Sequence, residues 1–438
     1  MLHIDHLLKK ILPLLIILIA VINLFPMELK AQKEVTIFGR TLPVDMIRKK
    51  AEEGNAGAMM ILSAMYIRGN GVEKDSIEGY KWLEKSAKAG NSFAMNDLAI
   101  LARHNKIPTQ DSAKSVFWLL AAADLGNTKA MINLGTLYMK GKDLIKDSIE
   151  AMRWYNKAAE KGDPMAMQML GFLYDNGKDI PKDTVLAIQW YTKAADAGES
   201  NAQNNLGLKY RKGRWVKRDY AAAMRLFKRS ADAGNPFGMQ NVGTMYQYGK
   251  GVQQDDANAL QWYLKSAAKS NKTSSPYFIG VFYEYGKGGL TPDITEAIKW
   301  YQKAETKDAL AAGMYRMGNI YEYGKGNIKA DTDQAMKYYQ AAADGGNIFG
   351  MYYLAHLYEI KQNKEQAERW YQKAFDLFTK EIKRSIDDTE LMMGLALMYE
   401  NGNGTEKNIQ QAINLYRQAA ELGDEDAKLK WKEFDQKK

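Results

Sequence analysis

The chain has 438 residues, a formal net charge of +9 and no cysteine. This length exceeds one ordinary domain, so either several cores or one repeat array is expected. The lack of cysteine excludes disulfide bonds, thiolate zinc sites, cysteine nucleophiles and a lipidated anchor cysteine. Hydrophobic residues at 46% and charged residues at 26% are typical of a folded chain and exclude a mostly disordered one.

Residues 1–31 have the pattern of a secretory signal peptide. Lys9 and Lys10 precede an apolar run over residues 11–25, and a polar stretch follows. The run is short for a membrane span and contains Pro13, which favours cleavage over retention as an anchor. We therefore expect export through the Sec pathway to the periplasm or the medium. Contact with a membrane is expected only if the segment is not cleaved.

Residues 32–43 are expected to form a short linker, and residues 44–430 form one array with a period of 36 residues. Seven of the nine tryptophans occupy one position of this period, which indicates a structural role in every unit. These tryptophans are Trp82, Trp118, Trp154, Trp190, Trp262, Trp300 and Trp370.

Each period predicts two helices. The first helix begins after an Asn or Asp cap such as Asn127 and ends at a glycine such as Gly141. The second helix begins after an Asp cap such as Asp147 and carries the tryptophan. Small residues such as Ala130 and Gly135 allow the two helices to approach closely, and the aromatic residues fill the gaps between neighbouring units.

The repeated string Ala-x-x-x-Leu-Gly-x-x-Tyr-x-x-Gly-x-Gly-Val-x-x-Asp-x-x-x-Ala-x-x-Trp-Tyr-x-Lys-Ala-Ala resembles the Sel1-like repeat, a relative of the tetratricopeptide repeat. The resemblance implies an all-α fold, a right-handed superhelical solenoid of about ten helical hairpins. Residues 43–53 and 423–434 are expected to be capping helices, and residues 431–438 a charged tail. The resemblance also implies a scaffold for another protein or peptide, with no catalysis and no cofactor.

The concave face of such arrays usually holds the partner, and first helices line it. Positions of the first helices that packing does not use carry mainly amides, which can bond a peptide backbone. An alternative is that these amides bond only neighbouring helices. The candidate residues are Asn96, Asn133, Gln168, Asn204, Asn205, Gln240, Asn241 and Tyr352.

Two further functions stay open at this point. Some secreted Sel1-like proteins are β-lactamase-like, and Ser266 with Lys269 matches a Ser-x-x-Lys pattern, although no Ser-Asp-Asn or Lys-Thr-Gly accompanies it. A cell-wall or β-lactam hydrolase is therefore one alternative. An envelope protein anchored by an uncleaved N-terminal helix is the other.

Neither a metal site nor nucleic-acid binding is expected. His104 and His356 are far apart in the sequence, and His3 and His6 precede the predicted cleavage point. A lysine follows the tryptophan position by three in six units, which spreads the positive charge along the array instead of forming one patch. We expect each stem to cover apolar surface and each ammonium group to stay in water. These lysines are Lys85, Lys157, Lys193, Lys265, Lys303 and Lys373.

Overall fold

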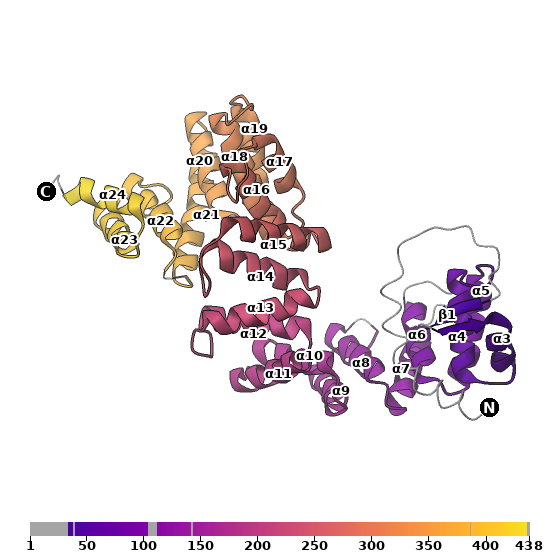
Figure 1. The fold of residues 1–438 in the computed structure, drawn as a ribbon. Coiled ribbons are helices and arrows are strands. Elements are labelled where there is room, and N and C mark those ends of the chain that lie inside the picture. The colour runs from indigo at the N-terminus through magenta and orange to yellow at the C-terminus, as the bar shows by residue number, and fades with distance from the viewer. Residues whose placement is uncertain (1–33, 38–39, 104–111, 142, 386, 436–438) are drawn as a thin grey trace. The chain divides into compact units, whose positions relative to one another are not determined.

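A computed structural model describes residues 34–37, 40–103, 112–141, 143–385 and 387–435. These residues form a two-stranded hairpin followed by 22 helices that pack as successive pairs (Figure 1). The all-α solenoid of helical hairpins predicted from the period is confirmed. The predicted signal peptide, His104 and residues 436–438 of the tail lie outside the described residues.

The chain divides into two units, residues 1–202 and 203–438. The first unit contains β1 (Glu34–Ile37), β2 (Arg40–Pro43), α3 (Val44–Glu52), α4 (Ala56–Arg68), α5 (Ser76–Lys88), α6 (Ser92–Arg103), α7 (Ser112–Asp124), α8 (Thr128–Lys140), α9 (Ser148–Glu160), α10 (Pro164–Asn176) and α11 (Thr184–Asp196). The boundary falls within α12 (Ser200–Lys212).

The second unit continues with six repeats and ends in a single helix. Its elements are α13 (Tyr220–Asp232), α14 (Pro236–Gln247), α15 (Asp256–Lys269), α16 (Ser275–Tyr285), α17 (Ile294–Gln302), α18 (Lys307–Tyr323), α19 (Thr332–Asp344), α20 (Ile348–Ile360), α21 (Lys364–Ile382), α22 (Thr389–Asn401), α23 (Ile409–Glu421) and α24 (Glu425–Asp435). The lone helices α3 and α24 stand where the period predicted capping helices.

The segment expected to be a linker differs from the prediction, because it contains the β1–β2 hairpin. The strands pair antiparallel, with Val35 opposite Leu42. Val35 is only 2% exposed and belongs to the same apolar cluster as Val44 and Met65. The hairpin therefore packs against α3 and the first repeat, at the N-terminal end of the part of the chain that the structure describes.

The predicted helix caps are present. The Asn127 side chain accepts a hydrogen bond from the Ala130 amide, and the Asp147 carboxylate accepts from the amides of Ile149 and Glu150. Gly141 has a φ of 63°, a left-handed conformation that glycine adopts without strain. These caps explain why both helices of a repeat begin and end at fixed positions.

The residue that follows the tryptophan position is the centre of each repeat. Trp82, Trp154 and Trp370 are buried, but Trp118, Trp190, Trp262 and Trp300 keep part of their surface in water. The next residue is almost completely buried, because adjacent helical positions point about 100° apart. The members of this set are Tyr155, Tyr191, Phe227, Tyr263, Tyr301, Tyr339, Tyr371 and Tyr416.

A glycine of the first helix packs on this aromatic ring. A Cβ atom placed on Gly171 would lie 2.8 Å from the Tyr191 ring, and one on Gly243 would lie 2.8 Å from the Tyr263 ring. The close helix approach predicted from the small residues is therefore made at this contact in the repeats that carry Gly135, Gly171, Gly207, Gly243, Gly280 and Gly318.

The lysines that follow the tryptophans are exposed to water, and they also make a contact that was not predicted. Their ammonium groups lie over the indole rings, at 3.9 Å from the ring centroid for Lys303 on Trp300 and at 4.6 Å for Lys193 on Trp190. The same contact forms at Lys85, Lys157, Lys265 and Lys373. The indole offers a negative π face, which attracts the ammonium group while the lysine stays exposed to water.

Candidate functional site

Several of the amides predicted to bind a partner lie inside the packing. Asn96, Asn204 and Asn241 are buried. Asn133 donates to Asn96 and Asn241 donates to Asn204, each over 2.8 Å. Each bond joins the first helices of neighbouring repeats, as in the alternative given above, so these amides stabilise the stacking of repeats.

The other candidates are partly exposed. Gln168, Asn205 and Tyr352 keep part of their surface in water, and Gln240 accepts a hydrogen bond from the Ser274 amide at 2.7 Å. The structure brings Tyr352 next to other tyrosines but places Gln168 and Asn205 on separate helices. Their role in binding stays a prediction.

Ser266 does not have the surroundings of a nucleophile. Its side chain is fully buried, and its hydroxyl donates to the Pro236 carbonyl oxygen at 2.8 Å. Ser275 donates to the same hydroxyl oxygen at 2.8 Å. Ser86 makes the equivalent bond to the Ala56 carbonyl oxygen in the first repeat. Ser266 therefore joins two helices, and a substrate has no access to it.

The second unit has a feature that the amide pattern missed, a row of exposed tyrosines at the ends of its first helices. Tyr248 is 55% exposed, Tyr285 48% and Tyr323 61%. They lie 37 or 38 residues apart, and Gln247, Glu284 and Glu322 precede them. This spacing was the signal in the sequence that could have revealed them.

The residue before each exposed tyrosine is anchored in the core. Glu284 accepts a hydrogen bond from the Tyr301 hydroxyl at 2.6 Å, and Glu322 accepts one from the Tyr339 hydroxyl at 2.6 Å. Gln247, Glu359 and Glu400 accept equivalent bonds from Tyr263, Tyr371 and Tyr416. The buried ring thus holds a row of polar side chains in place on the first helices.

Arg316 and Lys325 complete the site around Tyr285. The Arg316 guanidinium donates to the Tyr285 hydroxyl at 2.9 Å and lies 5.7 Å from the ring centroid. Lys325 lies 5.5 Å from the same ring and 2.8 Å from Glu284, which is buried. One aromatic ring and one carboxylate therefore hold two cations of the chain itself.

Glu390, at the start of α22, faces the same side of the unit. It interacts electrostatically with Arg316 and with the hydroxyls of Tyr248, Tyr315 and Tyr353. Glu390 is exposed to water, yet desolvation by the surrounding protein raises the pKa of its carboxyl group.

We call this surface the tyrosine face. It consists of Tyr248, Tyr285, Tyr315, Tyr323, Tyr352 and Tyr353, together with Arg316 and Glu390. The rings of Tyr315 and Tyr353 lie 5.7 Å apart, and those of Tyr352 and Tyr353 lie 5.5 Å apart. The face therefore presents adjoining aromatic rings with charged groups of both signs.

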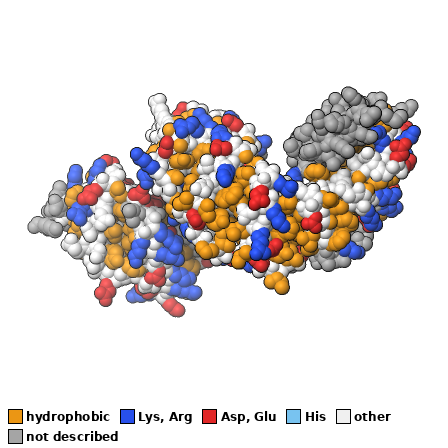
Figure 2. Space-filling model, turned by 90° about the horizontal axis from the view of Figure 1, so that it is seen from below, with side chains coloured by type: hydrophobic (Ala, Val, Ile, Leu, Met, Phe, Trp, Pro, Cys, Tyr) orange, Lys and Arg blue, Asp and Glu red, His pale blue; other side chains and the backbone are white. Residues whose placement is uncertain are grey.

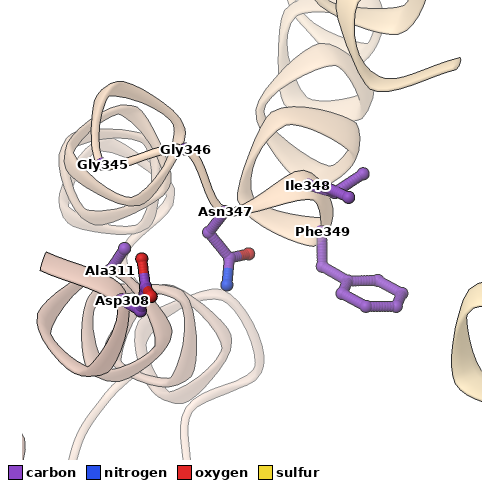
Figure 3. Close-up of a pocket in the computed structure, with 7 residues that line it drawn as sticks. All are labelled: Asp308, Ala311, Gly345, Gly346, Asn347, Ile348 and Phe349. Carbon is purple, nitrogen blue, oxygen red and sulfur yellow. The ribbon is translucent and has the colours of Figure 1, made fainter. Parts of the chain in front are cut away.

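A cavity of about 260 Å³ lies at the turn before α20. Figure 3 shows the Asn347 side chain between the helix that carries Asp308 and the helix that carries Ile348 and Phe349. Asn347 caps α20 by accepting from the Gly350 amide at 2.7 Å.

The equivalent gap between α8 and α10, in the first unit, is bridged, because the Thr128 hydroxyl donates to the Asp163 carboxylate at 2.7 Å. The Asn347 cavity is therefore an inter-repeat gap left open, and its residues have structural roles. A second cavity, of about 410 Å³, lies beside Trp154 and Lys157 in the first unit.

The described residues contain no group of three or more His, Asp or Glu side chains placed to hold a metal ion. None of the helices in this part of the chain combines the length and the apolar character of a membrane span. Figure 2 shows Lys and Arg side chains interspersed with Asp and Glu on the face it draws, instead of one basic patch.

Stacked helix pairs with a surface-exposed face of aromatic and charged side chains define an α-helical repeat protein of the tetratricopeptide-like class. The Sel1 repeat matches the chain at residues 56–91, 92–127, 128–163, 164–199, 200–235, 236–271, 277–308, 311–347, 348–377 and 389–424. The chain belongs to the Sel1 repeat family. The ten matches agree with the array of about ten helical hairpins expected from the sequence.

Two solved structures are similar along most of the chain. A protective antigen of uropathogenic Escherichia coli strains, displaying an SLR fold, is 28% identical, covers 90% of this chain and 82% of that chain, and has a TM-score of 0.62. A Sel1 repeat protein from Oxalobacter formigenes is 26% identical, covers 77% of this chain and 99% of that chain, and has a TM-score of 0.52. No curated protein matches the sequence. Sel1 repeat proteins are generally scaffolds for protein interactions.

Proposed function

We propose that the chain is an exported scaffold that binds a segment of another protein on its tyrosine face. The observation that carries this proposal is the row of exposed tyrosines at equivalent positions of successive repeats, beside Arg316 and Glu390. Tyrosine and arginine are enriched at the centres of protein interfaces, because a tyrosine ring supplies contact area at a small entropic cost. Such a scaffold needs no cofactor and carries out no turnover.

Of the amides predicted from the sequence, the buried Asn96, Asn204 and Asn241 lie within the packing of the repeats. The partly exposed Tyr352 belongs to the face itself, and Asn205 and Gln240 of the same unit would add polar contacts. The hydrolase alternative loses its candidate nucleophile, because Ser266 is buried and bonded to Pro236.

Export rests on the sequence of residues 1–31. N-terminal sequencing of the chain from the envelope and the medium tests it. A mature chain that begins near residue 32 supports secretion, and an intact N-terminus in a membrane fraction supports the anchored alternative. Chain recovered from the cytosol contradicts both.

Partner capture tests the binding face. The full chain is compared with a Tyr285→Ala, Tyr323→Ala double variant and with Phe117→Ala, which removes a ring that is 62% exposed on a second helix. We expect the proteins captured from the envelope by the full chain to be lost with the double variant and retained with Phe117→Ala. Equal capture by the double variant, at an unchanged melting temperature, would place the binding surface elsewhere.

A further inference from the structure

We infer that Glu322 and Tyr323, with Tyr352 and Tyr353, form a binding site for an arginine side chain of the partner segment. This inference rests on the proposed function and names the chemistry that the tyrosine face recognises. It is carried by a comparison between two successive repeats of the chain.

The preceding repeat shows the site in an occupied form. There Glu284 and Tyr285 hold the cations of Arg316 and Lys325, through the contacts described above. The aromatic ring and the carboxylate are thus an arrangement that this chain already uses to bind a guanidinium group and an ammonium group.

The next repeat keeps the carboxylate and the aromatic ring, but it has no residue equivalent to the Arg316 and Lys325 cations. Gly280, Gly318 and Ala355 occupy equivalent positions, so Glu322 and Tyr323 correspond to Glu284 and Tyr285. Counted from these equivalent positions, Tyr353 occupies the position of Arg316, and Gln362 occupies the position of Lys325.

The Glu322 carboxylate and the Tyr323 ring of this second site are accessible to a cation from another molecule. Within the described residues, no lysine or arginine forms an ion pair with Glu322, and none lies over the Tyr323 ring. Tyr323 is 61% exposed, more than Tyr285. A cation from outside can therefore reach both the ring and the carboxylate.

The residue in place of Arg316 adds a further aromatic group. The Tyr323 hydroxyl interacts electrostatically with Glu322 and with the hydroxyls of Tyr352 and Tyr353, and desolvation together with these neighbours raises the pKa of Tyr323 to about 12. The Tyr353 ring lies 5.6 Å from the ring of Tyr339, whose hydroxyl donates to Glu322 at 2.6 Å. Aromatic rings near one carboxylate form a site for a cation. A guanidinium group fits best, because it stacks on rings, pairs with a carboxylate through a planar fork and is weakly hydrated.

The probe for this site is a labelled peptide of six Arg-Ala repeats, measured by fluorescence anisotropy against the full chain. Its control is the same peptide with citrulline, the neutral isostere, in place of arginine. The net charge of +9 on the chain opposes nonspecific attraction of the arginine peptide. We expect the citrulline peptide to bind about tenfold more weakly or worse.

Three variants locate the site. Tyr323→Ala and Glu322→Gln should each weaken binding of the arginine peptide about tenfold, while Tyr323→Phe keeps the ring and should retain binding. Gln362→Lys places a lysine at the position equivalent to Lys325, one repeat later. It should also weaken binding of the arginine peptide, because the chain then supplies its own cation to the site. Phe117→Ala is the matched control and should change nothing.

Equal affinity for the two peptides, no binding of the arginine peptide, or full binding by Tyr323→Ala would overturn the arginine site. Capture of the natural partner that depends on Tyr285 and Tyr323 would still uphold the proposed function in those cases. A melting temperature for every variant separates lost binding from lost folding.

Discussion

At the scale of single residues, six of the ten repeats are held together where a glycine of the first helix meets the aromatic ring that follows the tryptophan position. No side chain fits between Gly243 and Tyr263, where a Cβ atom would lie 2.8 Å from the ring. The period predicted small residues at this position. It did not reveal which of two adjacent aromatic residues faces the glycine, because both recur with the same spacing.

Gly243→Ala tests this contact. Alanine favours a helix over glycine by about 1 kcal/mol, whereas the forced overlap with Tyr263 costs about 1–3 kcal/mol. We expect a net loss of stability, measured as a lower melting temperature. The loss should shrink when Tyr263 is first replaced by leucine, since the ring no longer occupies the space. A more stable Gly243→Ala variant would contradict the packing described.

The buried tyrosines predict a dependence of stability on pH. Burial and the neighbouring carboxylates Glu284 and Glu359 raise the pKa values of Tyr301 and Tyr371 above the ordinary value of about 10. The unfolded chain releases these protons at about pH 10, whereas the folded chain retains them. Their stabilising effect is therefore complete below about pH 10 and is lost as the pH rises further.

We expect the melting temperature to fall steeply above about pH 10, and the fall to be smaller in Tyr301→Phe, which has no proton to release there. Phenolate absorbance of the folded chain provides the second readout. A Tyr301→Phe variant that loses stability as steeply as the parent chain would contradict this account.

At the scale of elements, the capping structures decide how the array ends. The N-terminal cap contains the β1–β2 hairpin, whose Val35 lies against Val44, Met65 and Gly71. In a solenoid each repeat contacts only its neighbours, so a defect at one end stays local.

Val35→Asp places a charge in this cluster and should destabilise the first repeat by about 1–3 kcal/mol. Hydrogen exchange then measures faster exchange in α4, with no change in α22. Uniform loss of protection along the whole chain would show that the hairpin is not a local cap.

The helices were predictable because caps, small residues and aromatic residues recur together. Asn127, Asp147 and Gly141 stand where the helices begin and end. The hairpin was missed because it occurs once and has no repeat to support it, although Val35, Ile37 and Leu42 around Gly39 are typical of two short strands. Arg316 and Glu390 were not found as a site, since only the fold brings them close.

At the scale of the whole molecule, the Sel1 repeats share the same helix packing, whereas the side chains on their surface differ from one repeat to the next. The positions that hold Arg316 and Lys325 in one repeat hold Tyr353 and Gln362 in the next, while the small residue of the packed side changes only from Gly318 to Ala355. Because the packing tolerates such changes on the first helices, binding specificity can evolve there without loss of the fold.

Photo-crosslinking from the tyrosine face tests the central claim most directly. A photoreactive benzoylphenylalanine replaces Tyr323 in one preparation of the full chain and Phe117 in another, and both are irradiated with envelope extract. We predict that a protein crosslinks from position 323, that an arginine-rich segment lies at the attachment point, and that position 117 yields no such product. The same product from both positions, or from position 117 alone, would contradict binding on the tyrosine face.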